Sequence, residues 1–273
     1  MPSLVPSDAS DVPPEHALLT VDMKEYSQLP EAKMAPARAD LDDILATVFA
    51  QSGIGDVTSL SSAVKDRGDG AIFVLPARHA ARLVDPLLTY LGQALERREQ
   101  TRLASAPPIR LRASVHVGPL APPDHRGDAV NDACRLVDSD AARQAMAAAV
   151  DNGVLLAAVV SDTVFRRTVA AGRASALKEH HFHRATARVE GKPGFEETCW
   201  LFVPRLVPAV ITPYLAGGSD AVPAGRQDRA AQRSTRDSTS DEDREGVRQK
   251  GKASGKARLV QVGRDYITGP EQS

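Results

Sequence analysis

Residues 16–27 read HALLTVDMKEYS, an apolar run that ends on an acidic residue, and this stretch sets the fold expected for the chain. The run from His16 to Val21 predicts a buried β-strand with Asp22 at its end. Downstream, residues 35–52 carry apolar side chains at helical spacing, namely Leu41, Ile44, Leu45, Val48 and Phe49. The sequence therefore predicts a strand that leads into an amphipathic helix.

The next segment predicts a β-hairpin with an acidic tip. Residues 59–65 and 70–76 have the composition of strands, and Asp66-Arg67-Gly68-Asp69 between them is rich in turn-forming residues. Residues 80–100 carry leucines at helical spacing, and residues 109–117 alternate apolar and polar side chains as a strand does. The order β-α-β-β-α-β predicts an α+β fold with a ferredoxin-like core.

Further elements follow this core. Residues 128–149 and 161–170 predict helices, and residues 153–160, 183–189 and 198–203 predict strands. We therefore expect a C-terminal α/β extension of the ferredoxin-like core. The pair Arg97-Arg98 is expected at the solvated end of the helix over residues 80–100, because helix C-termini favour cations.

Composition divides the 273 residues into four segments. Residues 1–14 are expected to be a flexible N-terminal segment, and residues 15–206 a single globular domain of ordinary size. Residues 207–258 are predicted to be a disordered polar linker, because the stretch from Gly217 to Lys256 has almost no large apolar residue to bury. Residues 259–268 are predicted to form a short strand-like motif at the end of this tail, which is itself predicted to be disordered.

Charge and cysteine content narrow the classes of partner. The chain has 34 basic and 35 acidic side chains, so no global field attracts nucleic acid or an anionic membrane. The two cysteines, Cys134 and Cys199, are too few for a disulfide framework and suit a reducing compartment. No segment resembles a signal peptide or approaches the roughly 20 apolar residues of a membrane span. We expect a cytoplasmic protein that binds neither nucleic acid nor membrane.

Two pairs of polar residues are candidates for chemistry. Asp22 and Asp69 each stand where a strand is expected to end, and carboxylate oxygens are the ligands that hard divalent cations prefer. Two such carboxylates can hold a pair of divalent ions against a triphosphate. Asn131 and Arg135 lie four residues apart in a predicted helix, so their side chains project from one face.

Three motifs carry a resemblance to a known family. Residues 22–27 read DMKEYS, residues 65–70 read KDRGDG, and residues 124–135 read DHRGDAVNDACR. From about Leu18 to Phe202 the chain resembles the catalytic domain of the class III nucleotidyl cyclases, the adenylate and guanylate cyclase family. That family follows the patterns Asp-Ile-x-Gly-Phe-Ser, Lys-x-x-Gly-Asp-Gly and Asp-x-x-Gly-x-x-Val-Asn-x-Ala-x-Arg. The second and third patterns match without a gap.

The resemblance implies a reaction and a set of roles. A nucleoside triphosphate would be converted to a 3′,5′-cyclic monophosphate and pyrophosphate, with two Mg²⁺ or Mn²⁺ ions per site. Asp22 and Asp69 would bind the metal ions. Asn131 would orient the ribose and Arg135 would contact the α-phosphate, where charge builds in the transition state.

Base recognition follows from the same resemblance. Lys65 and Asp124 occupy the positions that read the purine edge in the family's adenylate cyclases, and a lysine donor with an aspartate acceptor suits ATP better than GTP. Lys192, in the turn over residues 190–194, lies where the family places a lysine on the β- and γ-phosphates. The other interpretation of Lys192 is an ordinary surface lysine in a turn.

The family's geometry also implies a partner. Its metal-binding aspartates face the base- and ribose-binding residues across a head-to-tail dimer interface, so we expect a homodimer with two composite sites. The leading hypothesis is an adenylate cyclase that makes cyclic AMP. A second hypothesis keeps the chemistry and changes the base, as in the pyrimidine cyclases of antiphage systems that use CTP or UTP.

A third hypothesis belongs to another class of protein. Glu25 stands where many relatives have glycine, close to the expected path of the triphosphate, and a carboxylate there could repel substrate. Residues 259–268, centred on Val260-Gln261-Val262-Gly263, look like short signalling motifs that stack homotypically, or like a short strand that docks on its own domain. Together these features suggest a cyclase-like nucleotide-binding scaffold that acts through its C-terminal motif.

Overall fold

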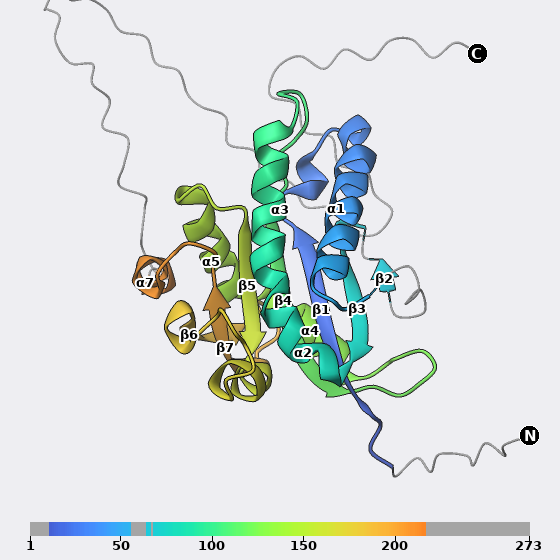
Figure 1. Cartoon of the computed structure of the whole chain (residues 1–273). Helices are drawn as coiled ribbons and strands as arrows, with labels where there is room; N and C mark the ends of the chain where they lie inside the picture. The colour runs from blue at the N-terminus through green and yellow to red at the C-terminus, as the bar shows by residue number, and fades with distance from the viewer. Residues whose placement is uncertain (1–10, 56–63, 67, 217–273) are drawn as a thin grey trace, which may run out of the picture. The chain divides into compact units, whose positions relative to one another are not determined.

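A seven-stranded sheet runs through the part of the chain that the structure describes, in the order β2-β3-β1-β4-β5-β7-β6 (Figure 1). The computed structural model describes residues 11–55, 64–66 and 68–216. The strands are β1 (Glu15–Met23), β2 (Val64–Asp66), β3 (Gly70–Pro76), β4 (Leu111–Pro119), β5 (Leu156–Ser161), β6 (His183–Arg188) and β7 (Glu196–Phe202).

Helices connect and cover these strands. The α-helices are α1 (Glu31–Gln51), α2 (Ala80–Val84), α3 (Leu87–Thr101), α4 (Asp128–Asp138), α5 (Asp140–Asp151), α6 (Asp162–Phe165) and α7 (Pro208–Ala216). Single turns of other helix types are η1 (Tyr26–Gln28), η3 (Ala77–His79), η4 (Arg166–Ala170) and η5 (Glu179–His181).

The first four strands form the predicted ferredoxin-like core. Strand β1 lies between β3 and β4 and is antiparallel to both, while β2 and β3 form an antiparallel hairpin. Helix α1 follows β1, and α2 with α3 follow β3, so the β-α-β-β-α-β order and its α+β class are confirmed. Residues 59–63 of the predicted hairpin and residue 67 of its turn lie outside the described residues, as do residues 1–10 and 217–273.

The predicted α/β extension adds three strands to this core. Helices α4 and α5 connect β4 to β5, which lies parallel to β4. Strand β7 then pairs antiparallel with β5, and β6 forms the outer edge. The sheet thus grows from one side of the core only.

The two faces of the sheet have different covers. Alternate residues of the central strands, such as Leu19, Phe73 and Val115, pack against α1, α2 and α3 in the largest core, and Figure 1 shows α1 and α3 side by side over this face. On the other face Leu18 packs with Ala129 and Ala133 of α4. Because side chains alternate along a strand, Asp22 shares the α4 face with Leu18.

Two predicted helices are each divided in the structure. The helix expected over residues 80–100 breaks between Val84 and Leu87, where Pro86 lacks the N–H that a continuous helix needs. The helix expected over residues 128–149 breaks at Ser139, whose Oγ accepts a hydrogen bond from the Ala142 N–H and caps α5.

The folded part continues beyond the predicted boundary at residue 206. Helix α7 packs against α5, and Ile211 within it is fully buried. The polar composition that suggests a linker begins only at Gly217, and the residues before it include Val210, Ile211 and Leu215. Those apolar side chains are enough to bind the helix to the domain.

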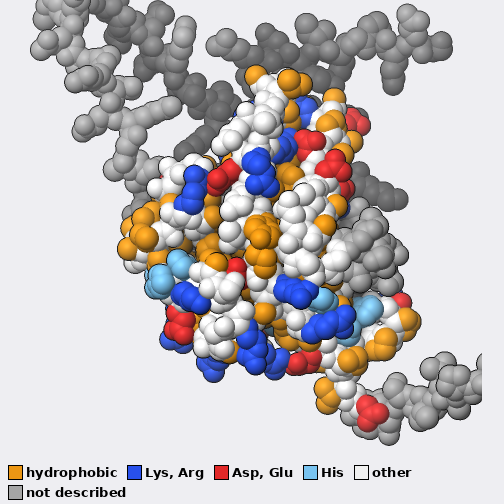
Figure 2. Space-filling view, viewed as in Figure 1, with side chains coloured by type: hydrophobic (Ala, Val, Ile, Leu, Met, Phe, Trp, Pro, Cys, Tyr) orange, Lys and Arg blue, Asp and Glu red, His pale blue; other side chains and the backbone are white. Residues whose placement is uncertain are grey.

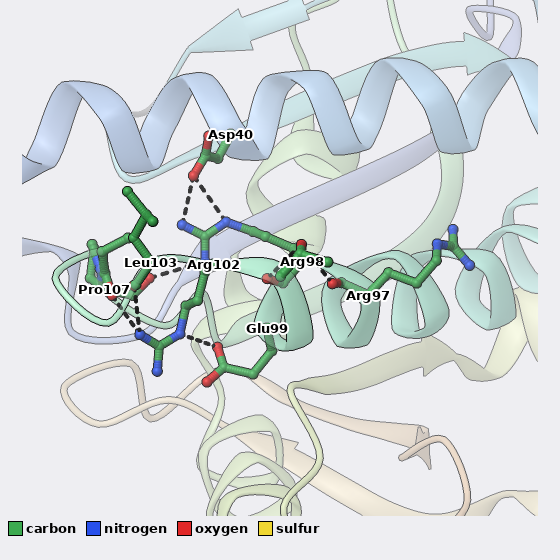
Figure 3. A network of polar contacts seen from close by, with 9 residues as sticks. Asp40, Arg97, Arg98, Glu99, Arg102, Leu103 and Pro107 are labelled. Atoms are coloured by element: carbon green, nitrogen blue, oxygen red, sulfur yellow. Dashed lines mark hydrogen bonds and ion pairs between the residues drawn. The ribbon is translucent and has the colours of Figure 1, made fainter.

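The prediction that Arg97-Arg98 is a solvated helix end is wrong for Arg98. Its side chain is only 12% exposed, and its guanidinium donates to Asp40 Oδ2 of α1 at 2.6 and 3.0 Å and to the Pro107 carbonyl at 3.0 Å. Figure 3 shows Arg98 turned toward α1 while Arg97 points away from the network. Arg98 therefore links α1 to α3 and to the loop before β4.

Candidate active site

The sheet register brings Asp22 and Asp69 to neighbouring strand ends. Asp22 pairs with Gly70 in the β1–β3 register, and the Met23 N–H donates to the Asp69 carbonyl at 3.0 Å. Gly70 permits this approach, because a Cβ there would lie 1.9 Å from the Val21 carbonyl oxygen. The pair predicted from sequence is therefore assembled by one hairpin and the strand beside it.

Arg38 of α1 fixes the hairpin tip. Its Nη1 donates to the Gly70 carbonyl at 2.9 Å and to the Gly68 carbonyl at 3.1 Å. Gly68 has φ +82°, a left-handed conformation that L side chains rarely adopt. The glycines around Asp69 thus have backbone reasons to be glycine, and Arg38 is a supporting residue that the sequence pattern did not reveal.

Asp22 is buried and paired with a cation. The residue is 5% exposed, and its Oδ2 accepts from Arg112 Nε at 3.0 Å and from Arg112 Nη2. Arg112 lies opposite Asp22 in the β1–β4 register. The alternation of residues 109–117 shows Arg112 to be a polar position, but only the register of the two strands shows that it lies at the carboxylate. Arg112 is therefore a residue of the candidate site that sequence reasoning missed.

Glu25 has the backbone conformation that explains the glycine of the family pattern. Its φ is 65° and its ψ 18°, within the left-handed region. The carboxylate contacts Lys24, whose hydrogen bond lowers the pKa of Glu25, and Arg110 Nη1 at 3.3 Å. Two cations therefore offset the charge of the Glu25 carboxylate.

Asn131 and Arg135 both lie on α4, which the sheet holds firmly. A Cβ on Gly118 would lie 2.6 Å from Ala129 Cβ, so α4 approaches β4 closely. Ser114 Oγ also donates to the Ala133 carbonyl of α4 at 2.7 Å. Asn131 is exposed and Arg135 is partly exposed, so the amide and the guanidinium are accessible from one side of the helix.

Arg135 points toward the β6–β7 side of the sheet. Its Nη1 donates to Asp132 at 3.0 Å, and its guanidinium carbon lies 5.5 Å from the centroid of the Phe195 ring. Burial, followed by the charge of Asp132, raises the pKa of Glu197, whereas Arg135 opposes this shift. Burial also raises the pKa of Cys199 to about 12, so this thiol stays protonated near neutral pH.

The two pairs of candidate residues have different partners in the structure. In the described residues Asp22 pairs with Arg112 on the β1–β4 side, whereas Arg135 pairs with Asp132 and packs on Phe195 of the extension. The candidate residues therefore fall into two groups with different neighbours, which we call the two halves of the candidate site. The first half carries two carboxylates, and the second carries an amide and a guanidinium.

The remaining predicted residues lie in peripheral segments. Lys65 is in β2, opposite Ile72 in the register. Asp124 is exposed in the loop between β4 and α4 and pairs with Arg126 at 3.5 Å; this loop is the long green excursion in Figure 1. Lys192 is exposed in the β6–β7 turn, where its N–H donates to the Val189 carbonyl at 3.0 Å. Their substrate roles remain predictions.

Among the residues that the structure describes, no group of three or more His, Cys, Asp or Glu side chains is arranged to hold a metal ion. The carboxylate pair of the candidate site would accordingly need further ligands from substrate or water. None of the described helices combines the length and the apolar character that a bilayer crossing requires.

Comparisons with known proteins find likeness in structure alone. No family model matches the chain, and no curated protein matches it in sequence. An adenylate/guanylate cyclase/hydrolase from Silicibacter pomeroyi is similar at 23% identity and a TM-score of 0.47, over 70% of this chain and 98% of that one.

Two further solved structures are similar at lower identity. A bacterial light-regulated adenylyl cyclase has 16% identity and a TM-score of 0.45, over 74% of this chain and 96% of that one. A dimeric guanylyl cyclase domain of the RhoGC fusion protein from Blastocladiella emersonii has 13% identity and a TM-score of 0.43, over 71% and 99%. We therefore base the proposed function on the residues of this chain.

Proposed function

We propose that this chain is a class III nucleotidyl cyclase that converts ATP to 3′,5′-cyclic AMP and pyrophosphate. The observation that carries the proposal is the adjacency of Asp22 and Asp69 at the tip of the β1–β3 pair, with Arg112 beside them. The unbroken matches over residues 65–70 and 124–135 support it.

The donor set fits divalent cations. Asp22 already accepts from a cationic side chain, so its buried carboxylate sits in a site suited to positive charge. Asp22 and Asp69 would hold Mg²⁺ or Mn²⁺, and two such ions would activate the attacking 3′-hydroxyl and neutralise the charge of the leaving pyrophosphate. Arg112 would then be released from Asp22 and would be free to contact a phosphate of the substrate.

The second half of the site would orient the nucleotide. Asn131, exposed on α4, would hydrogen-bond the ribose, and Arg135 one turn later would contact the α-phosphate. Arg135 would have to exchange its bond to Asp132 for the phosphate. A guanidinium held in this way stabilises the charge of the transition state without a large reorganisation.

Base choice rests on two side chains. Lys65 would donate to N1 of adenine and Asp124 would accept from its N6 amine, which favours ATP over GTP. The exposure of Asp124 supports a role in binding, because its carboxylate has only a surface ion pair to give up. Lys192 would contact the β- and γ-phosphates from the β6–β7 turn.

Dimerisation would complete the site. The carboxylate half and the amide–guanidinium half have different neighbours within the chain, and one substrate would take one half from each of two chains. A head-to-tail homodimer would provide two such composite sites. The isolated chain would then bind metal ions but would not turn over substrate.

Product analysis tests the proposal. Purified protein is incubated with Mn²⁺ and, separately, with ATP, GTP, CTP and UTP, and the products are identified by mass spectrometry. Cyclic AMP as the main product is the expected result. Preference for CTP or UTP would replace ATP with a pyrimidine substrate, and absence of any cyclic product despite nucleotide binding would contradict the enzyme activity.

Two variants make the assay specific. Asp22→Asn keeps the size of the side chain and removes the metal-binding charge, so turnover should fall by at least about a hundredfold. Arg143→Gln is the matched control, since Arg143 is half-exposed on α5 and pairs only with Asp140 at 3.5 Å. The control variant should retain the wild-type rate.

A further inference from the structure

Three arginines line a surface cavity that is separate from the candidate active site. The cavity has a volume of about 280 Å³ and is lined by Ala77, Arg78, Ala80, Ala81, Val117, Arg167, Thr168 and Arg173. These residues come from η3, α2, the end of β4, and η4 with the loop that follows it. Segments far apart in the sequence therefore converge on one basic hollow.

The cavity lies at the opposite end of β1 from the carboxylate pair. Val117 of its wall pairs with Ala17 near the start of β1, whereas Asp22 near the end of β1 pairs with Arg112. Asp22 lies five positions after Ala17 in the extended strand, which corresponds to roughly 16 Å at about 3.3 Å per residue. A ligand in this cavity would not contact the metal-binding aspartates.

Positive charge around the cavity exceeds the negative charge available to it. Arg167 pairs with Glu15 at 2.7 Å, and Arg173 Nη1 donates to the Arg167 carbonyl at 3.0 Å. In residues 11–55, 64–66 and 68–216, no acidic side chain pairs with Arg78 or with Arg173. Two guanidinium groups thus remain available for an external anion.

His79, next to Arg78 in the sequence, responds to the positive charge of the arginines around it. Burial, and next the charges of Arg78 and Arg82, lower the pKa of His79, which lies between them in sequence. Figure 2 shows Lys and Arg side chains gathered over the lower part of the molecule, where α2 lies in Figure 1. The lowered pKa of His79 is consistent with the positive charge of the arginines next to it.

The shape and chemistry of the cavity favour one class of ligand. Guanidinium groups match the oxygens of a phosphate through two parallel hydrogen bonds, and several guanidiniums together suit an anion with more than one charge. The alanines and Val117 supply an apolar wall, and the cavity has room for one or two phosphate groups but not for a nucleic-acid duplex. We propose that this cavity binds a small phosphate-bearing anion with two or more negative charges.

Glu15 gives the proposal a distinctive consequence. Its carboxylate occupies Arg167 in the free protein and would compete with the ligand for that guanidinium. Removing the charge of Glu15 should therefore tighten binding, whereas removing the charges of Arg78 and Arg173 should weaken it. Nonspecific attraction to a basic surface would not depend on a single carboxylate in this way.

Isothermal titration calorimetry on the full chain tests the proposal. The protein is kept in EDTA, so that the proposed metal site holds no ions, and is titrated with pyrophosphate, inorganic phosphate or AMP. We expect pyrophosphate to bind once per chain. Tighter binding of AMP would identify a nucleotide as the source of the phosphate, and tighter binding of pyrophosphate would identify a free polyphosphate.

Four variants decide the location. Arg78→Gln combined with Arg173→Gln should weaken binding by roughly tenfold to a hundredfold, as expected for the loss of charge-assisted hydrogen bonds. Glu15→Gln should tighten binding by several-fold. Arg143→Gln, an exposed arginine elsewhere, and Asp22→Asn should bind as the wild type does, which separates this site from the proposed active site.

Several outcomes would overturn the proposal. It fails if no anion binds the wild type, if the double arginine variant binds as tightly as the wild type, or if Arg143→Gln weakens binding equally. Arg78 and Arg173 are exposed, so circular dichroism should show the double variant folded. If the double arginine variant is unfolded, Glu15→Gln still tests the proposal. Anion binding that is unchanged or weaker in Glu15→Gln contradicts it.

Discussion

Glu25 shows how one residue can depart from a family pattern at a cost in backbone strain. A non-glycine residue in the left-handed region loses about 1 kcal/mol relative to glycine, while surface ion pairs such as those of Glu25 contribute little. We therefore expect Glu25→Gly to raise the free energy of unfolding by about 0.5 kcal/mol or more. Urea denaturation measures the change, and Glu25→Ala, which keeps the strain, is the control. Equal stability of the two variants would contradict this explanation.

Arg112 should matter both for stability and for metal binding. Replacing it by alanine leaves the buried Asp22 carboxylate without a partner, so the free energy of unfolding should fall by roughly 3 kcal/mol in EDTA. Mn²⁺ should stabilise Arg112→Ala more than it stabilises the wild type, because no guanidinium competes for the carboxylate. Thermal unfolding with and without Mn²⁺ measures both effects.

The control for this variant is Arg110→Ala. Arg110 lies two residues earlier in the chain, is 32% exposed and pairs with Glu25 at the surface. Its loss should change stability by less than about 1 kcal/mol and leave the Mn²⁺ effect as it is in the wild type. An equal response to Mn²⁺ in Arg112→Ala and the wild type would argue that Asp22 does not bind the ion.

His116 makes stability depend on pH. Burial lowers the pKa of His116 below its ordinary value of 6.5, and Asp132 opposes this only in part. Below about pH 6.5 the unfolded chain therefore binds more protons than the folded chain, so stability is lost as the pH falls. His116→Asn should lose less stability than the wild type between about pH 7 and pH 5 in urea denaturation. A steeper loss in the variant would show that the sign is wrong.

At the scale of elements, Arg98 joins helices α1 and α3. Its Nε and Nη2 both donate to Asp40 Oδ2, its Nη1 donates to the Pro107 carbonyl, and the side chain is only 12% exposed (Figure 3). A double-mutant cycle of Arg98→Ala with Asp40→Ala should give a coupling energy of about 1 kcal/mol, since Asp40 itself is half-exposed. Arg97→Ala should change stability by less than about 0.5 kcal/mol. Additive effects of the two changes would contradict the link.

Local sequence patterns predicted where helices and strands lie, but they did not predict which residues of different elements contact each other. The spacing of apolar residues was enough for β1, α1 and β4, because periodicity reports directly which face of an element is buried. The sequence did not predict the break at Ser139, because a serine is tolerated within a helix. Its side chain caps the first turn of α5 only because the chain leaves the helical conformation at this residue. Arg112 was missed for another reason, because its partner belongs to another strand and is set by the register.

At the scale of the whole molecule, the sequence predicted the order of the core elements and the position of Asp22 near the end of its strand. It could not predict the end of the domain from polar composition alone, because α7 is short and its few apolar residues gain their value only by packing on α5. The basic cavity was also invisible, since Arg78, Arg167 and Arg173 come together only through the fold. Both features depend on contacts between distant segments.

The composite site is the central claim, and mixing two inactive variants tests it most directly. Asp22→Asn lacks the carboxylate half and Arg135→Ala lacks the guanidinium half, so each homodimer should be inactive. After exchange of subunits, half of the dimers are mixed, and each mixed dimer has one intact site of two, so the mixture should recover about a quarter of the wild-type rate of cyclic AMP formation. The wild type must be active, and the mixture must be shown to contain mixed dimers. If such a mixture is as inactive as the two variants alone, the result contradicts a site shared between two chains.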